Sequence, residues 1–510
     1  MQLYTLRRAQ GDQGIGDLTD LAAFARQAGA AGIGAIGLNP LHALFLQDRT
    51  RASPYHPSDR RFVDPLCIDV AALAVPSALA AAAPVFAGLA AGALVDYPAV
   101  WEAKRGVLEA AFAAFRPGAD FSGFVAEGGT ALLGFARFQA IAEVHGADWR
   151  RWPAALRDPS GPAVAAAAAP ERVNFSLFLQ WVADRQLAAA AAACGGMEIG
   201  LYRDLAVGAA PDGAEAWAAG AALMHGVSVG APPDRLGPQG QVWGLPPPDP
   251  IAQRESGYAS FVALLRANMR HAGALRIDHV MGLARLFLVP EGGRAADGTY
   301  LAYPLRDLLG QLALESVRAG CLVVGEDLGT VPDGFRAALA EHDVLSYQVL
   351  RFARDWDRLL PPARYPVNAV ACAASHDMAT ITGWWQGNDI DERVALGLLD
   401  AAAEAAERRA RGVEKAELVA LLEAEGLAGG DLVASVHALL ARTPCRLVLL
   451  QADDLAGEVV GVNLPGTDRE RPNWRRRLRV DVAELVALRK EGQGSALDPQ
   501  GGGGPLDPIP

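Results

Sequence analysis

Three acidic side chains end short apolar runs of the sequence. Asp278, Glu326 and Asp377 each stand at the end of such a run, and two of them have Arg276 or His376 as a close neighbour. A single carboxylate in this position usually caps the helix that follows. Three of them favour a shared site, because the carboxyl ends of parallel strands lie together at one face of a fold.

Paired carboxylates without a metal or cofactor motif indicate chemistry on a glycosidic bond. One carboxyl group must keep a proton for the leaving oxygen, and the other must stay ionised to attack the anomeric carbon. Arg276 precedes Asp278 by two positions, so it lies on the same face of a strand, where it would hold Asp278 as an anion. Aromatic side chains that could stack on sugar rings occur in predicted loops: Tyr55, Trp243, Trp384 and Trp385.

Two other motifs are excluded by their surroundings. Residues 32–37 match G-x-G-x-x-G, but a predicted helix precedes them and a strand follows, the reverse of a dinucleotide-binding unit. Residues 226–230 match G-x-S-x-G, but two prolines follow at 232 and 233 and exclude the helix that a serine-hydrolase elbow requires. Zinc and calcium motifs are absent from the sequence, so we expect neither a metal nor a cofactor.

The composition argues against other classes of partner. The 510 residues carry a net charge of −12, which disfavours binding to nucleic acid. We interpret the one dense basic run, residues 475–479, as a solvated helix end. The uncharged stretch 70–95 is rich in Ala and contains Pro76 and Pro84, so we predict two short helices there and no membrane span.

The cysteines indicate the compartment. There are five, at wide spacing and without a C-x-x-C pair, which is typical of reduced thiols. The N-terminal residues lack the basic and apolar regions of a signal peptide. We therefore expect a cytoplasmic protein.

Eight short and nearly continuous apolar runs predict parallel strands that are buried on both faces. Helical stretches separate these runs, so the expected class is α/β. The number of runs favours a (β/α)8 TIM barrel, with an open doubly wound sheet as the alternative. The runs are residues 2–6, 33–41, 199–207, 274–280, 321–325, 346–350, 370–374 and 446–450.

The uneven spacing of the runs predicts large insertions. We expect a single catalytic barrel over residues 1–490, with largely helical insertions at about 45–195, 208–270 and 385–440. Insertions after barrel strands rise on the C-terminal face, where they wall a substrate cleft. The Gly- and Pro-rich segment 491–510 is predicted to be a disordered tail.

Seven stretches, in order along residues 1–480, resemble the 4-alpha-glucanotransferases of glycoside hydrolase family 77 in the alpha-amylase clan, which include amylomaltase and the disproportionating enzymes. The sequence departs from the family pattern at Gln13, where Trp is common, and mildly at Ala452. The matching stretches are residues 37–44, 53–55, 200–208, 230–234, 276–282, 325–329 and 463–467.

The resemblance implies a barrel enzyme that moves α-1,4-glucan segments between malto-oligosaccharides, with glucose as an acceptor, by a retaining double displacement. It makes Asp278 the nucleophile, Glu326 the acid/base, and Asp377 the carboxylate that grips sugar hydroxyls in the transition state. In this resemblance Tyr55 stacks on sugar, Trp243 lies in a loop over the cleft, and Phe352 lines the acceptor side. The substrate-binding residues that it implies are Tyr55, Asp204, Trp243, Arg276, Phe352, His376 and Asn463.

Two other functions remain to be weighed. An alpha-amylase-type hydrolase would use the same three carboxylates, because both reactions form a glycosyl-enzyme and differ in whether sugar or water resolves it. A glucan-binding protein without turnover would lack at least one carboxylate, and none is missing. Since residues 237–244 are rich in Gly, we predict a mobile loop in which Trp243 favours transfer. The alternative is that Trp243 is buried and only packs the insertion against the barrel.

Overall fold

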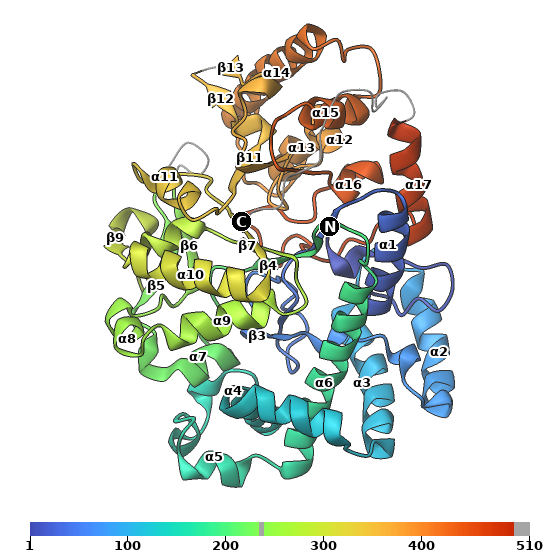
Figure 1. Cartoon of the computed structure of the whole chain (residues 1–510), viewed down its shortest axis with the longest axis vertical. Coiled ribbons are helices and arrows are strands. Elements are labelled where there is room, and N and C mark those ends of the chain that lie inside the picture. The colour runs from blue at the N-terminus through green and yellow to red at the C-terminus, as the bar shows by residue number, and fades with distance from the viewer. Residues whose placement is uncertain (234–238, 357, 494–510) are drawn as a thin grey trace.

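Seven parallel strands form the centre of the computed structural model, which describes residues 1–233, 239–356 and 358–493 (Figure 1). Their order is β1-β4-β7-β10 followed by β11-β14-β15, and a bridge between Val324 and Leu345 joins the two groups. The strands are β1 (Ala35–Gly37), β4 (Gly200–Leu205), β7 (Ala274–Ile277), β10 (Leu322–Gly325), β11 (Ser346–Val349), β14 (Ala369–Cys372) and β15 (Leu447–Leu449).

These strands confirm seven of the eight predicted runs. Every residue of β4, β7 and β14 is buried, as expected where helices cover both faces of a sheet. The prediction of a strand at residues 2–6 is wrong, because Leu3–Thr5 forms a 3-10 turn. The side chain of Asn39 accepts a hydrogen bond from the Leu3 amide, and the Thr5 hydroxyl donates to the carbonyl of Gln2, so these backbone groups are satisfied without a ladder.

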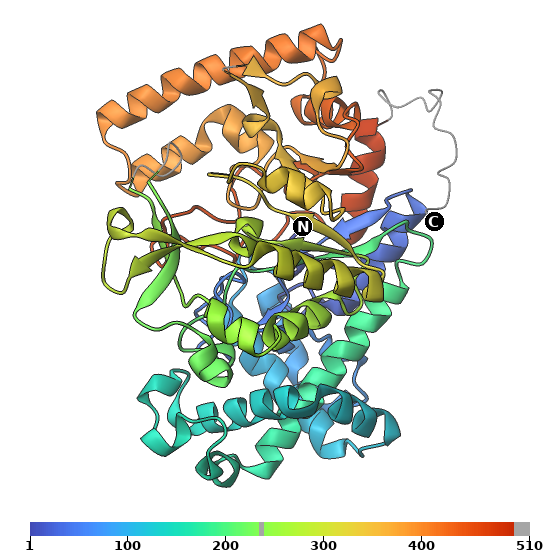
Figure 2. The ribbon, with the colours of Figure 1, turned by 60° about the vertical axis from the view of Figure 1, so that its left-hand side comes forward.

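Helices surround the strands and extend the molecule along its long axis. Figure 1 shows α2 to α6 below the strands and α12 to α15 above them, and Figure 2 shows α14 as a long helix along the upper end. The helices are α1 (Leu18–Ala30), α2 (Pro76–Ala90), α3 (Tyr97–Ala114), α4 (Ala119–His145), α5 (Pro162–Ala167), α6 (Pro170–Ala192), α7 (Ala214–Ala219), α8 (Pro250–Glu255), α9 (Ala259–Met269), α10 (Leu305–Ala319), α11 (Phe335–Ala340), α12 (Ile381–Gln386), α13 (Asn388–Ala395), α14 (Ala401–Ala424), α15 (Leu432–Ala441), α16 (Ala452–Leu455) and α17 (Val482–Gln493).

Antiparallel strands that the sequence did not reveal stand beside the parallel ones. A four-stranded sheet has the order β6-β5-β8-β9, and two hairpins pair β2 with β3 and β12 with β13. Most of these strands are short or carry few apolar residues in a row. Strand β8 is different: its four residues from Leu286 to Val289 are apolar and buried, and the sequence analysis did not identify this run as a strand. The strands are β2 (His42–Ala43), β3 (Asp59–Val63), β5 (Val227–Ala231), β6 (Gln241–Leu245), β8 (Arg285–Pro290), β9 (Thr299–Ala302), β12 (Arg354–Asp355) and β13 (Arg358–Leu359).

The stretch 70–95 differs from its prediction. It contains a 3-10 turn at Val70–Ala72 and one helix, α2, that begins at Pro76 and continues through Pro84. Pro76 is accommodated because proline suits the first turn of a helix. Pro84 cannot donate to the carbonyl of Ala80, but Ala80 is exposed, so solvent can satisfy that carbonyl. Within the described chain, none of the helices has both the length and the apolar character needed to cross a membrane.

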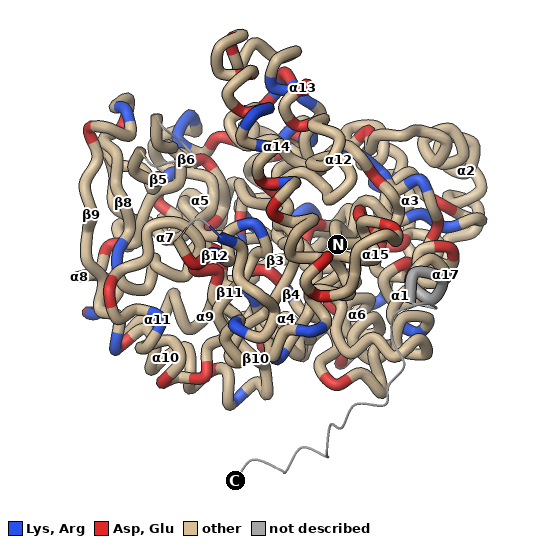
Figure 3. The backbone as a smooth tube through the Cα atoms, turned by 90° about the horizontal axis from the view of Figure 1, so that it is seen from above, with Lys and Arg blue, Asp and Glu red and all other residues tan. Residues whose placement is uncertain are grey.

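Charged residues of both signs are interspersed along the chain (Figure 3). The basic run 475–479 is not a solvated helix end, because it pairs with acids from distant segments. Arg477 is 2% exposed, and its guanidinium donates to Asp12 and to the carbonyl of Leu6. Arg476 pairs with Asp453 and with Glu458. The Arg477 contacts tie this segment to the first residues of the chain, and the Arg476 pairs tie it to α16 and the residues that follow α16.

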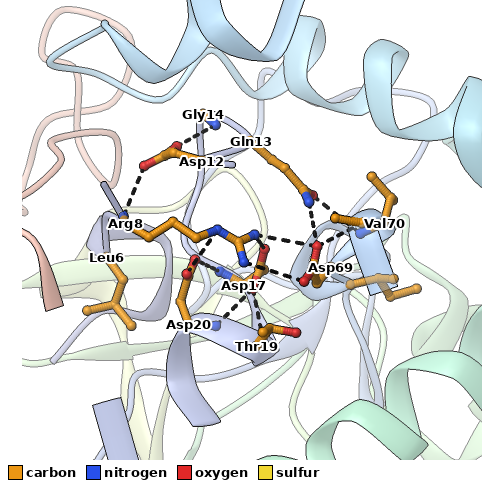
Figure 4. Close-up of polar contacts among 12 residues, drawn as sticks. Leu6, Arg8, Asp12, Gln13, Gly14, Asp17, Thr19, Asp20, Asp69 and Val70 are labelled. Carbon is orange, nitrogen blue, oxygen red and sulfur yellow. Dashed lines mark hydrogen bonds and ion pairs between the residues drawn. The ribbon is translucent and has the colours of Figure 1, made fainter. Parts of the chain in front are cut away.

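A buried polar cluster fixes the start of α1 (Figure 4). Asp17 caps this helix through the amides of Thr19 and Asp20, and Arg8 bridges Asp17 to Asp69. Gln13 donates its amide to Asp69 and accepts a hydrogen bond from the Val70 amide. These contacts join the segment before α1 to the turn at Val70–Ala72.

The end of the described chain overlaps the predicted tail. Helix α17 ends at Gln493, so its last turn includes the first three residues of the segment 491–510. The rest of that segment lies outside the described residues.

Candidate active site

Backbone pairing brings the first two carboxylates together. Gly325 of β10 pairs with Ile277 of β7, so Glu326 and Asp278 leave neighbouring strands at the same level. The ladder continues beyond the strands, because the Glu326 amide donates to the carbonyl of Ile277 and the Val280 amide donates to that of Glu326. Adjacent parallel strands thus set the two acids side by side.

Arg276 lies behind Asp278. One guanidinium nitrogen donates to Asp278 Oδ1 at 2.9 Å, and the other donates to both oxygens of Asp204 at 2.7 and 2.9 Å. The alternation of side chains along β7 places Arg276 and Asp278 on one face. This arrangement puts a fixed positive charge beside the carboxylate of Asp278.

Glu326 is held in a buried position. Its two oxygens accept hydrogen bonds from the amides of His279 and Leu328, both at 2.9 Å, and the residue is 9% exposed. Burial, together with the negative charge of Asp278, raises the pKa of Glu326 to about 7, although Arg276 and the two amides oppose this shift. Near neutral pH a large fraction of Glu326 therefore carries the proton that a leaving oxygen needs.

Asp377 is open to solvent and remains ionised. Asn463 donates to its Oδ1 at 2.7 Å, and His376 Nε2 lies 3.4 Å from its Oδ2. The surrounding protein weakens its hydration, but the charge of His376 and these hydrogen bonds lower the pKa of Asp377 to about 2. Burial by itself lowers the pKa of His376, but the charge and hydrogen bond of Asp377 have the larger effect, so the pKa of His376 is raised.

Tyr55 connects the pair of Arg276 and Asp204 to the pair of His376 and Asp377. Its hydroxyl donates to Asp204 Oδ2 at 2.6 Å and lies 3.0 Å from His376 Nδ1, and its ring stacks on that of His376 with centroids 4.2 Å apart. Asp204 is buried; both of its oxygens accept from Arg276, and Oδ2 also accepts from Tyr55. The sequence analysis missed Trp474, whose ring lies within 5.5 Å of Tyr55 and His376; its only signal was a tryptophan directly before the basic run.

The remaining predicted aromatic residues occupy different environments. Trp243 lies on β6, and its ring meets that of His279 edge-on, with centroids 5.2 Å apart. Phe352 ends the 3-10 turn after β11 and is partly exposed. Trp384 is buried in a hydrophobic cluster beneath Arg351 and Arg411, so it is not available to stack on sugar. Residues 234–238, which precede β6, lie outside the described residues.

The parallel α/β fold and its strand-end carboxylates define an enzyme that breaks and forms glycosidic bonds. One carboxylate beside an arginine and a second carboxyl group that holds a proton near pH 7 are the two components that such chemistry requires. In the part of the chain that the structure describes, no group of three or more His, Cys, Asp or Glu side chains could hold a metal ion.

Comparison with known proteins gives the family. The model of glycoside hydrolase family 77, described as 4-alpha-glucanotransferase, matches residues 1–482, and the chain belongs to this family. It is an enzyme that transfers α-glucan segments. The α/β barrel class predicted from the sequence is that of these enzymes, and seven of the eight predicted parallel strands form among the described residues. The match favours transfer over the hydrolytic alternative.

Two curated relatives support this assignment over nearly the whole chain. The 4-alpha-glucanotransferase of Mycobacterium tuberculosis is 38% identical over 93% of this chain and 70% of its own length. That of Haemophilus influenzae is 34% identical over 96% of this chain and 76% of its own length.

Two solved structures share the fold. Amylomaltase from Corynebacterium glutamicum has a TM-score of 0.84 and 32% identity over 96% of this chain and 72% of its own. Amylomaltase from Streptococcus agalactiae, solved in complex with acarbose, has a TM-score of 0.80 and 21% identity over 97% of both chains, and supports the fold alone.

Proposed function

We propose that the enzyme transfers α-1,4-glucan segments by a retaining double displacement in which Asp278 is the nucleophile and Glu326 the acid/base. In the first step Asp278 forms a bond to the anomeric carbon while the bond to the leaving oxygen breaks, and Glu326 gives that oxygen its proton. In the second step Glu326 removes the proton of an acceptor hydroxyl, whose oxygen displaces Asp278. The observation that carries this proposal is the contrast between Asp278, paired with Arg276, and Glu326, whose pKa is raised to about 7.

We assign Asp377 to the transition state. Its carboxylate is ionised, about half exposed and flanked by His376 and Asn463, which suits hydrogen bonds to sugar hydroxyls that strengthen as the ring distorts. Because Asp204 is occupied by Arg276 and Tyr55, we propose that it orients these residues rather than binding sugar directly. Phe352 is proposed to line the acceptor side.

The proposed substrates are malto-oligosaccharides and longer α-1,4-glucans, with glucose as an acceptor. The decisive assay is incubation with maltotriose and chromatography of the products. Glucose together with a ladder of longer oligomers would support transfer between malto-oligosaccharides. Maltose and glucose without a ladder would contradict it.

The carboxyl separation gives a geometric prediction. A retaining enzyme should hold the carboxyl carbons of Asp278 and Glu326 about 5–5.5 Å apart, whereas about 6.5–9.5 Å would leave room for a water and indicate inversion. A crystal structure of the enzyme with a bound oligosaccharide measures this distance directly. A value in the larger range, with both side chains ordered, would contradict the double displacement.

Trp243 is proposed to favour transfer by shielding the glycosyl-enzyme from water. The edge-on contact with His279 brings its ring next to the residue that follows Asp278. Trp243→Ala should therefore lower the ratio of transfer to hydrolysis about tenfold, through loss of an aromatic contact and entry of water. The ratio is measured from glucose and oligomer yields with maltotriose.

Val242→Ala provides the matched control. Val242 is the neighbouring residue on β6, points to the opposite face and is 48% exposed. Its variant should keep the wild-type ratio. If Trp243→Ala unfolds at a lower temperature but keeps that ratio, Trp243 packs the insertion against the barrel and does not exclude water from the glycosyl-enzyme.

We also propose that residues 1–490 form one catalytic unit that works in the cytoplasm. The unit is supported by Arg477, whose ion pair with Asp12 and hydrogen bond to the carbonyl of Leu6 join the C-terminal part of the chain to its first residues. The compartment is supported by the five cysteines, which are all free thiols. Burial raises the pKa of Cys67, Cys321 and Cys372 to about 12, so these three stay protonated and unreactive.

A further inference from the structure

Trp474 forms a wall behind the side chains that hold Asp377. It is 5% exposed, and its ring centroid lies 5.4 Å from that of Tyr55 and 5.5 Å from that of His376. The stacked pair of Tyr55 and His376 therefore has Trp474 on its flank. His376 Nε2 lies 3.4 Å from Asp377 Oδ2, and a shift of the Trp474 indole would leave space for His376 to move away from that carboxylate.

The backbone of Trp474 reaches a second partner of Asp377. Its amide donates to the carbonyl of Val462 at 2.9 Å, and the next residue, Asn463, donates to Asp377 Oδ1 at 2.7 Å. Asn473 reinforces this contact, because its side chain accepts a hydrogen bond from the amide of Leu464. Trp474 thus supports both side chains that contact the carboxylate of Asp377, namely His376 and Asn463.

The helical insertion fixes the conformation of Trp474. Its φ is +61°, a left-handed value that non-glycine residues adopt only when their surroundings enforce it. The hydroxyl of Tyr97, the first residue of α3, donates to the Trp474 carbonyl at 2.7 Å. The Val95 amide donates to the carbonyl of Arg475 at 2.7 Å, so the chain before α3 runs along this segment.

We propose that Tyr97 and Trp474 are positioning residues for Asp377. The insertion that carries α3 holds Trp474, and Trp474 holds His376 and Asn463 against the carboxylate. The insertion would then contribute to the rate of the reaction, in addition to any role as a wall of the cleft. This inference rests on the proposed role of Asp377 in the transition state.

A pair of hydroxyl deletions tests the contribution of the insertion. Tyr97→Phe removes the hydrogen bond to Trp474 and should lower kcat for maltotriose transfer about fivefold, with KM changed less than about twofold. Tyr4→Phe is the matched control. Its ring lies 6.2 Å from that of Tyr97, and its buried hydroxyl has no hydrogen-bond partner among the described residues. Equal kcat in the two variants would overturn the role of Tyr97.

A double-mutant cycle separates positioning from plain core packing. Trp474→Ala should lower kcat about 100-fold in the active enzyme, and Trp474→Phe, which keeps a ring, should recover most of it. In an Asp377→Asn background the same Trp474 substitutions should change kcat less than about threefold, because the group that they position is already disabled. Trp474→Phe keeps the test usable if the alanine variant does not fold.

The outcomes distinguish this inference from the proposed function. If Trp474 substitutions cause the same loss in both backgrounds while Asp377→Asn itself is strongly impaired, the positioning role is wrong and the role of Asp377 stands. If Asp377→Asn transfers glucan as fast as the wild type, the role proposed for Asp377 fails, and the positioning proposal fails with it.

Discussion

Asp278→Ala is expected to lower transfer from maltotriose by about 10⁴-fold or more, because no glycosyl-enzyme can form without the nucleophile. Azide should restore turnover of α-maltosyl fluoride in this variant, since the small anion can occupy the space of the lost carboxylate. The product should be the β-linked maltosyl azide, because one displacement inverts the anomeric carbon. Product analysis by NMR measures both the rate and the configuration.

The control for this experiment is the azide response of the wild type. Wild-type enzyme keeps its nucleophile, so azide should not speed its consumption of α-maltosyl fluoride. An Asp278→Ala variant that folds but gives the α-linked azide, or whose residual rate azide leaves unchanged, would contradict the assignment of Asp278 as nucleophile. Thermal unfolding shows whether the variant is folded.

Glu326→Gln is expected to lower kcat/KM for maltotriose about 10³-fold, because the sugar leaving group must be protonated as it departs. Fluoride needs little protonation, so formation of the glycosyl-enzyme from α-maltosyl fluoride should fall less than about tenfold. Stopped-flow measurement of fluoride release isolates this step. Equal losses with both donors would show that Glu326 does not serve as the acid.

The raised pKa of Glu326 also predicts the alkaline limb of the pH profile. Its proton is lost as the pH rises through about 7, so kcat/KM for maltotriose should fall above that pH. Fluoride release from α-maltosyl fluoride should not show this limb, and the limb should be absent in Glu326→Gln. A wild-type profile that stays flat to pH 9 would contradict the shifted pKa.

Stability should follow the same titration. The folded-state pKa of Glu326 lies above its unfolded value of about 4.3, so the stability that this proton provides is complete below pH 4.3 and is lost as the pH rises through about 7. Glu326→Gln should therefore lose less stability than the wild type between pH 4.5 and about 8. Urea unfolding at the two pH values measures the difference. A variant that loses as much as the wild type would mean that Glu326 titrates normally in the folded state.

The sequence by itself determined seven of the parallel strands, the places of the three candidate carboxylates along the chain, and the family. Strands such as β4 and β14 are buried on both faces, so their residues form continuous apolar runs that can be recognised without a partner. Asp278 and Glu326 follow two such runs directly, and the spacing of Arg276 and Asp278 fixes a shared face on any strand. These features can be recognised because the residues that define them are close together in the sequence.

Only the tertiary structure decided how these residues are supported. The turn at Leu3–Thr5 depends on Asn39, the ion pair of Arg477 on Asp12, and the position of Trp474 on Tyr97. The two partners of each contact are separated by 36 to 465 residues, so a partner cannot be recognised from neighbouring positions. Hydrogen bonds and ring contacts between distant segments leave no periodic pattern in a sequence. They form only when the barrel and its helical insertion bring those segments together.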